Sequence, residues 1–158
     1  MRPSDASDRP ALEAFLRGQD ALHVARRGEL VDSLDHPAFL AVEGDQLLGV
    51  ATYVAGDGEW ELLTLHADRR YAGVGSVLVA AVREAAVRAG CRTLWVVTTN
   101  DNVDALRFYQ RRGFRLARLR QGAVDESRRT LKPEIPTTGD HGIPLRDELE
   151  LEMRLVQG

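Results

Sequence analysis

The segment RRYAGVGSVLVAAV, residues Arg69–Val82, constrains the fold most, because two closely spaced glycines lead directly into an apolar-periodic run. Glycine adopts backbone conformations that other residues avoid, so it permits a tight turn before a helix. The first N–H groups of an α-helix lack intrahelical acceptors, and this makes the helix start a site for anions. The segment therefore predicts a turn and a helix that together hold a phosphate group.

Three glycine-rich phosphate motifs compete for this turn. A P-loop requires a lysine after its last glycine, whereas Ser76 follows Gly75 here. A dinucleotide fingerprint requires a third glycine, and Leu78 stands at that position. The remaining pattern, Arg/Gln-x-x-Gly-x-Gly/Ala, is matched by Arg70, Gly73 and Gly75. It indicates a turn whose successive N–H groups wrap a pyrophosphate.

Hydropathy patterning places this turn within an α+β chain. It predicts helices over 8–17 and 21–34, a hairpin around Glu43–Asp45 and a strand over EWELLTLH at 59–66. The helix after the turn should run to Ala89 and end at Gly90. Its expected apolar face consists of Val74, Val77, Leu78, Ala81, Ala85 and Ala89.

The second half of the chain predicts a further strand, a short helix and two more strands. TLWVVTT at 93–99 has the β-branched composition of a buried strand, and Asn102 or Asn100 can cap the helix that follows. A strand begins at Phe114, a loop without clear periodicity covers 121–147, and ELELEMRLV alternates as a strand with one buried face. We expect one domain over residues 1–158, an α+β fold with a mixed, mostly antiparallel central sheet flanked by helices.

Composition excludes several classes of function. The net charge of −3 gives no basic field for nucleic acid, and no apolar run is long enough to span a membrane. A single cysteine, Cys91, and four scattered histidines show no metal-ligand spacing. We therefore expect a soluble cytoplasmic protein with no metal, no nucleic-acid partner and no membrane partner.

Two motifs, taken together, resemble a known family. LLTLHADRRYAGVGSVL is similar to the strand–turn–helix cofactor motif of the GCN5-related N-acetyltransferases, the GNAT superfamily. NDNVDALRFYQRRGF resembles that family's Asn-x-x-Ala-x-x-x-Tyr…Gly-Phe motif. The resemblance implies a GNAT-like acyl-CoA N-acyltransferase fold, with acetyl-CoA as the donor substrate.

The resemblance also assigns a set of residues to the cofactor. Leu63 and Leu65 would pair through their backbones with the pantetheine arm, and Arg70 would close the turn or neutralise phosphate. Asn102 would hydrogen-bond the pantetheine or cap its helix, with Asn100 as a second candidate. The backbone amides on the pyrophosphate would be those of Tyr71, Ala72, Gly73, Val74, Gly75 and Ser76.

Two residues carry the implied acyl-transfer chemistry. Tyr109 would be the general acid that protonates the departing thiolate, because a phenol of pKa about 10 can donate to a thiolate of pKa about 8–9. Glu61, with Glu59 second, would take a proton from the acceptor amine through a water. The structural alternatives are a core tyrosine packed between Phe108 and Phe114, and a solvated strand carboxylate.

The expected function is therefore an acetyl-CoA-dependent N-acetyltransferase in which the amine attacks directly in a ternary complex. The alternative is a non-catalytic CoA-binding or regulatory module with the same fold. The acceptor is a small-molecule or peptide amine, and a homodimer is one expectation. The loop at 121–147 either shapes the acceptor site or serves as a tether or dimer arm, and its acidic candidates for a cationic amine are Asp125, Glu126, Asp147 and Glu148. The arginines after Tyr109 form a basic cluster, either on the 3′-phosphate of CoA or at a solvated edge.

Overall fold

The computed structural model of the chain describes residues 1–68 and 72–156. It forms two compact units. The first unit consists of Met1–His23, Asp32–Leu94 and the end of the chain from Leu155. The second unit consists of Val24–Val31 and Trp95–Arg154. The expectation of a single domain over 1–158 stays a prediction.

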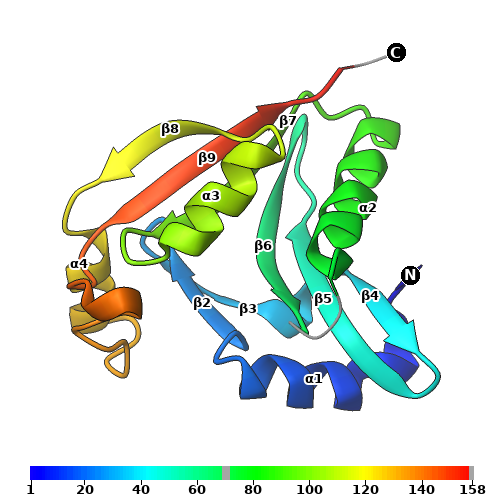
Figure 1. Cartoon of the computed structure of the whole chain (residues 1–158), viewed down its shortest axis with the longest axis horizontal. Helices are drawn as coiled ribbons and strands as arrows, with labels where there is room; N and C mark the ends of the chain where they lie inside the picture. Colours follow the sequence, from blue (N-terminus) through cyan, green and yellow to red (C-terminus); the bar gives the residue numbers. More distant parts are fainter. Residues whose placement is uncertain (69–71, 157–158) are drawn as a thin grey trace. The chain divides into compact units, whose positions relative to one another are not determined.

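The strands pair as one seven-stranded sheet in the order β1-β4-β5-β6-β7-β9-β8, and β2 and β3 form a separate pair (Figure 1). The pairs β1–β4, β4–β5, β5–β6 and β8–β9 are antiparallel, which confirms the predicted α+β fold with a mostly antiparallel sheet. The strands are β1 (Arg2–Pro3), β2 (His23–Arg26), β3 (Glu29–Asp32), β4 (Ala38–Glu43), β5 (Gln46–Val54), β6 (Glu59–Ala67), β7 (Thr93–Thr99), β8 (Arg115–Arg120) and β9 (Glu148–Arg154). The helices are α1 (Arg9–Gly18), α2 (Val74–Arg88), α3 (Val103–Arg111) and α4 (Ala123–Thr130).

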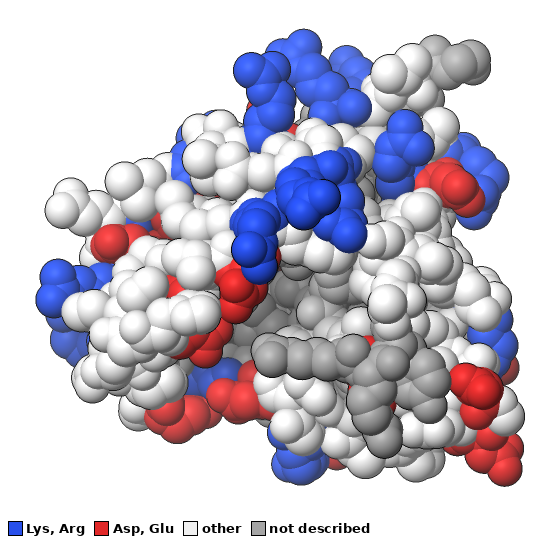
Figure 2. Space-filling view, in the orientation of Figure 1, with Lys and Arg blue, Asp and Glu red and all other residues white. Residues whose placement is uncertain are grey.

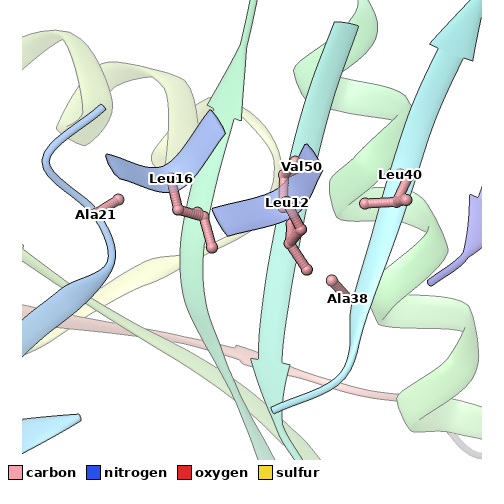
Figure 3. Close-up of a cluster of buried hydrophobic side chains, with 6 residues drawn as sticks. All are labelled: Leu12, Leu16, Ala21, Ala38, Leu40 and Val50. Carbon is pink, nitrogen blue, oxygen red and sulfur yellow. The ribbon is translucent and has the colours of Figure 1, made fainter. Parts of the chain in front are cut away.

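In the first unit, α1 covers one face of β4 and β5. Leu12 and Leu16 of α1 point towards Leu40 of β4 and Val50 of β5 (Figure 3). Consecutive residues of a strand point to opposite faces, so Gly49, next to Val50, faces away from α1. On that second face α2 packs against β4, β5 and β6. The first unit is therefore a sheet with one helix on each face.

The buried face of α2 differs from the one expected. Val77, predicted to lie inside, is 52% exposed. The residues that α2 buries are Leu78, Val79, Val82 and Ala86. The run VGSVLVAAV is apolar nearly all round, so periodicity alone did not determine which side the sheet would cover.

The helix expected over 21–34 is wrong, because these residues form the hairpin of β2 and β3. Arg27 and Gly28 connect the two strands, and both have positive φ angles, 51° and 75°. A two-residue hairpin turn of this type normally uses Asn-Gly or Asp-Gly. In Arg27 the left-handed conformation is supported from outside the hairpin, by contacts of its side chain that are described with the site below.

The loop at 121–147 is ordered, contrary to its lack of sequence periodicity. It contains α4 and a 3-10 turn at Asp140–Gly142. Arg128 of α4 donates from Nε to the carbonyl of Ile135 at 2.9 Å, and from Nη2 to those of Pro136 and Leu145, each at 2.8 Å. The guanidinium of Arg128 thus joins α4 to three backbone positions of the chain that follows. These hydrogen bonds stabilise a segment that has too few apolar residues for a hydrophobic core of its own.

Arg128→Ala should lower the free energy of unfolding by about 2–3 kcal/mol, because three backbone carbonyls lose a charged donor and two of these hydrogen bonds are part-buried. Urea denaturation measures this, and limited proteolysis should show new cleavage between residues 132 and 147. The matched control is Arg129→Ala, whose side chain is 69% exposed and paired only with Glu126. That control should stay within about 0.5 kcal/mol of the parent. Equal effects of the two variants would contradict the role given to Arg128.

Candidate active site

The glycine turn opens α2 as expected. Gly73 precedes the first helical residue with φ 85° and ψ −6°, a left-handed conformation that favours glycine. The N–H of Val77 donates to the carbonyl of Gly73 at 3.1 Å, which starts the helical ladder. Gly73 has no side chain, and α2 begins without a side-chain cap hydrogen bond. Arg70 and Tyr71, which the sequence also assigned to the cofactor, lie outside the described residues.

The strand before this turn carries an irregularity at the predicted cofactor position. In the pairing of β5 with β6, Thr52 faces Thr64 and Tyr53 faces Leu62, so Leu63 is an extra residue without a partner. Leu65, the second predicted residue, pairs regularly with Ala51. A β-bulge frees the backbone of the extra residue and redirects the strand, and such bulges are common beside active sites. The backbone of Leu63 thus lacks the regular pairing with β5 that Leu62 and Thr64 on either side have.

Gly49 of β5 is a site-determining residue that the sequence analysis missed. A Cβ atom at this position would lie 2.8 Å from Cγ1 of Val74 and 2.9 Å from Cδ1 of Leu78. Both distances are shorter than carbon atoms tolerate, so only glycine lets the first turn of α2 rest directly on the sheet. The signal in the sequence was a lone glycine within an apolar strand, which indicates a close approach of another element.

Glu61, the predicted general base, lies two residues before the bulge on β6. It is 2% exposed, so the alternative of a solvated strand carboxylate does not describe it. Glu59, the second candidate, is exposed at the start of the strand. A buried carboxylate accepts a proton only where a substrate or water reaches it, so the role of Glu61 as the base stays a prediction.

The three residues that follow β7, Asn100, Asp101 and Asn102, bind different parts of the second unit. Asn102 caps α3, because its Oδ1 accepts from the N–H of Ala105 at 3.1 Å. Asn100, the second cofactor candidate, instead holds the long loop: its Oδ1 accepts from the N–H groups of Arg146 and Asp147, and its Nδ2 donates to the carbonyl of Pro144. Between them, Asp101 is buried and accepts from the N–H of Asp140 at 2.9 Å.

Tyr109 projects from the last turn of α3 into an aromatic cluster. Its ring packs edge-on against Phe108 and Phe114, with centroid separations of 5.4 Å and 5.3 Å. The predicted packing as a core tyrosine is therefore present. None of the hydrogen bonds among the described residues involves the Tyr109 hydroxyl. Burial raises the pKa of Tyr109 far above its ordinary value, so the phenol stays protonated and able to donate.

The acidic residues expected to attract a cationic acceptor are already engaged within the second unit. Asp125 pairs with Arg128 at 2.8 Å, Glu126 pairs with Arg129, and Asp147 accepts from the N–H of Gly122 at 2.7 Å. These contacts use the charge within the loop itself. The role of these residues towards a cationic acceptor stays a prediction.

Glu148, the fourth of those acids, belongs to a buried network with Glu150. Arg27 donates from Nε to Glu150 at 2.8 Å while its guanidinium lies 3.4 Å from the ring centre of Trp95. Its N–H also donates to Glu148 at 3.3 Å, and Arg120 donates to Glu150 at 2.9 Å. These contacts hold Arg27 in its left-handed conformation and dock the β2–β3 turn on β9.

The pKa values of the two glutamates in this network are shifted in opposite directions. Burial raises the pKa of Glu148, and the N–H of Arg27 and the charge of Arg120 offset this only in part. Burial also acts to raise the pKa of Glu150, but the hydrogen bonds from Arg27 and Arg120 together outweigh it, so that pKa lies below its usual value. The strand β9 is therefore buried on both faces, with Glu148 and Glu150 on one and Leu151 and Met153 on the other. The sequence predicted a single buried, apolar face.

Two further observations bear on ligands and membranes. Within residues 1–68 and 72–156, no three His, Cys, Asp or Glu side chains come together in a group that could hold a metal ion. No helix in that part of the chain has the length and hydropathy to cross a membrane. Cys91 is buried, and burial raises the pKa of its thiol.

The family follows from comparison with known proteins. Residues 7–114 match the acetyltransferase (GNAT) family, and this range includes the turn, the bulged strand and Tyr109. The chain belongs to the GNAT acetyltransferase family. It is 40% identical over 119 residues to YdhI of Bacillus subtilis, covering 75% of this chain and 72% of that protein. It is 39% identical over 124 residues to YxbD of the same organism, covering 78% and 77%. Both of these relatives are described as uncharacterised.

Solved structures of this family share the fold. A GNAT acetyltransferase from Elizabethkingia anophelis with acetyl-CoA bound aligns with a TM-score of 0.64 at 22% identity, over 76% of each chain. An acetyltransferase from Bacillus subtilis in complex with CoA aligns with a TM-score of 0.67 at 19% identity, over 98% of this chain and 99% of that one. A ribosomal-protein-alanine N-acetyltransferase from Brucella melitensis gives 0.67 at 20% identity, over 98% of each. At these identities the likeness establishes the fold and leaves the acceptor open.

Gly49→Ala should weaken acetyl-CoA binding by about tenfold, because the new methyl group displaces the first turn of α2 by overpacking. Isothermal titration measures the affinity. The second substitution Val74→Ala removes the clashing Cγ1 atom and should restore most of it. Gly18→Ala is the matched control, since a Cβ there meets nothing within 4 Å. An unchanged affinity in Gly49→Ala would contradict the proposed role of the close approach.

Proposed function

We propose that this protein transfers the acetyl group of acetyl-CoA to a primary amine by direct attack within a ternary complex. Membership of the acetyltransferase family supports the reaction class. The observation that carries the proposal for this chain is the left-handed Gly73 at the start of α2, one turn after the bulged strand β6. A helix start without a side-chain cap binds pyrophosphate through backbone N–H groups and the helix dipole.

The donor residues follow from that placement. The backbone from Ala72 to Ser76 would receive the pyrophosphate, with Gly73, Val74 and Gly75 between them, and Arg70 and Tyr71 would complete the turn. Leu63 and Leu65 would meet the pantetheine arm along β6. The bulge at Leu63 supports this, because an N–H released from regular pairing can bond a ligand carbonyl or the oxyanion that forms on it. Asn102, whose Oδ1 caps α3, keeps its amide N–H₂ for the same arm.

The chemical step needs one proton removed and one supplied. The amine nitrogen attacks the thioester carbonyl, the C–N bond forms and the C–S bond breaks. Glu61 would accept the proton that the amine gives up, through a water, and Tyr109 would donate its phenolic proton to the CoA thiolate. The assignment of Tyr109 is supported by its place in the family motif and by a phenol that carries its proton. That of Glu61 is supported by its place on β6, two residues before the bulge.

Tyr109→Phe should lower kcat by about a hundredfold or more while leaving the affinity for acetyl-CoA nearly unchanged, because only the departing thiolate loses its proton donor. Steady-state kinetics and titration of acetyl-CoA separate the two quantities. Tyr53→Phe is the matched control: Tyr53 is a half-buried tyrosine that also packs against aromatic rings, 4.8 Å from Trp60 between ring centres. A Tyr109→Phe enzyme with the parent kcat would refute the acid role.

Turnover of acetyl-CoA across a panel of amine classes tests the function as a whole. The panel includes peptide N-termini, lysine side chains, polyamines and aminoglycosides, with release of free thiol as the measurement. We expect at least one class to be acetylated, and Glu61→Gln to slow that reaction most at neutral pH, where the amine is still protonated. Tight CoA binding without turnover of any amine would instead favour the non-catalytic CoA-binding module.

A further inference from the structure

We propose that the free edge of β8 docks an extended segment of a partner protein in which acidic and apolar side chains alternate. The segment would add to the sheet as one more strand beyond β8. This inference does not depend on the proposed function. β8 ends the order of the described strands, so one row of its backbone N–H and C=O groups has no strand beside it. Such an edge is a template for strand addition.

The pairing of β8 with β9 shows what chemistry this strand accepts. Every arginine of β8 faces a glutamate of β9, and every leucine faces a leucine. The register shifts between Leu116 and Arg118, so Ala117 is the extra residue and both leucines lie on the same face of the strand. The facing pairs are Arg115 with Glu152, Leu116 with Leu151, Arg118 with Glu150, Leu119 with Leu149 and Arg120 with Glu148.

The leucine side chains of β8 are covered only in part by the rest of the protein. Leu116 is 57% exposed and Leu119 is 64% exposed, whereas on β9 Leu151, opposite Leu116, is fully buried and Leu149, opposite Leu119, is half-buried. An added strand with apolar residues at the same positions would remove this surface from water. The favourable free energy of such burial scales with the apolar area that is covered.

Positive charge on this edge exceeds the carboxylates that neutralise it. Glu150 alone receives Arg27, Arg118 and Arg120, and the Arg118 side chain is still 68% exposed. The buried Nη1 atom of Arg120 lies 3.8 Å from Oε2 of Glu148, an ion pair without a hydrogen bond among the described residues. Figure 2 shows arginine side chains gathered over α3 and the beginning of β8. Carboxylates on a strand added at the free edge of β8 would face its arginines, as the glutamates of β9 do at the other edge.

These features favour an acidic–apolar partner over a second copy of the chain. Antiparallel pairing of β8 with another β8 would set arginine against arginine, and like charges directly opposite each other destabilise a sheet. At the start of β8 a hollow of about 430 Å³ is lined by two arginines and one glutamate, with net positive charge. It can take an acidic side chain at the end of the added strand. Its lining residues are Gly113, Arg115, Leu116, Glu152 and Arg154.

The test uses the full chain and a fluorescein-labelled synthetic peptide of about eight residues alternating Glu and Leu, which matches the length of an average strand. The control peptide alternates Lys and Leu. Fluorescence anisotropy should show the Glu/Leu peptide binding at least about tenfold more tightly than the Lys/Leu peptide, a difference of about 1.4 kcal/mol. In Arg118→Glu this preference should reverse. Arg88→Glu, an exposed arginine in the last turn of α2, should leave it unchanged.

A second variant separates docking from a general charge effect. Leu116→Ser with Leu119→Ser keeps every charge and should weaken binding of the Glu/Leu peptide by about tenfold, because the covered apolar area is lost. Circular dichroism melting confirms that each variant is folded. Absence of peptide binding, equal binding of both peptides, or unchanged binding in Arg118→Glu would overturn the proposal. Sedimentation that shows a dimer abolished by Arg118→Glu would assign the edge to a second copy and would overturn it also.

Discussion

The close approach of α2 to β5 at Gly49 determines where the first unit can hold a ligand. The helix start carries the N–H groups that would bind pyrophosphate, and its position is set by how closely Val74 and Leu78 rest on the sheet. Because the approach uses the face of β5 opposite to α1, the two helices do not compete for the same side of the strands. The bulge at Leu63 lies on the next strand, β6, against which α2 also packs.

The parts of the fold that depend on local chemistry could be predicted from the sequence. The Gly73 turn, the helix capped by Asn102 and the strand EWELLTLH each contain their own signal, and the structure contains all three. The assignment to the acetyltransferase family followed from two of those signals in order. The roles of Tyr109 and Glu61 remain predictions, although the burial of both is now known.

The parts that failed depend on contacts between distant residues. The hairpin of β2 and β3 was taken for a helix because an Arg-Gly turn has no local preference for the left-handed conformation. Its support comes from Trp95 and Glu150, which lie far along the chain. The apolar face of α2 and the order within residues 121–147 were missed for the same reason, since a uniform apolar run and a guanidinium bonded to backbone carbonyls leave no periodic pattern.

The division of labour after β7 has a consequence for exchanging parts between relatives. Asn100 and Asp101 bind the backbone of the long loop, while Asn102 begins the helix that carries Tyr109. A chimera that imports residues 121–147 without this pair would lose the anchors of its graft, and the strain would fall on the start of α3. The transferable module is therefore discontinuous: it consists of the loop together with two residues that lie some twenty positions before it in the chain. An exchange of this loop between relatives therefore requires that both pieces change together.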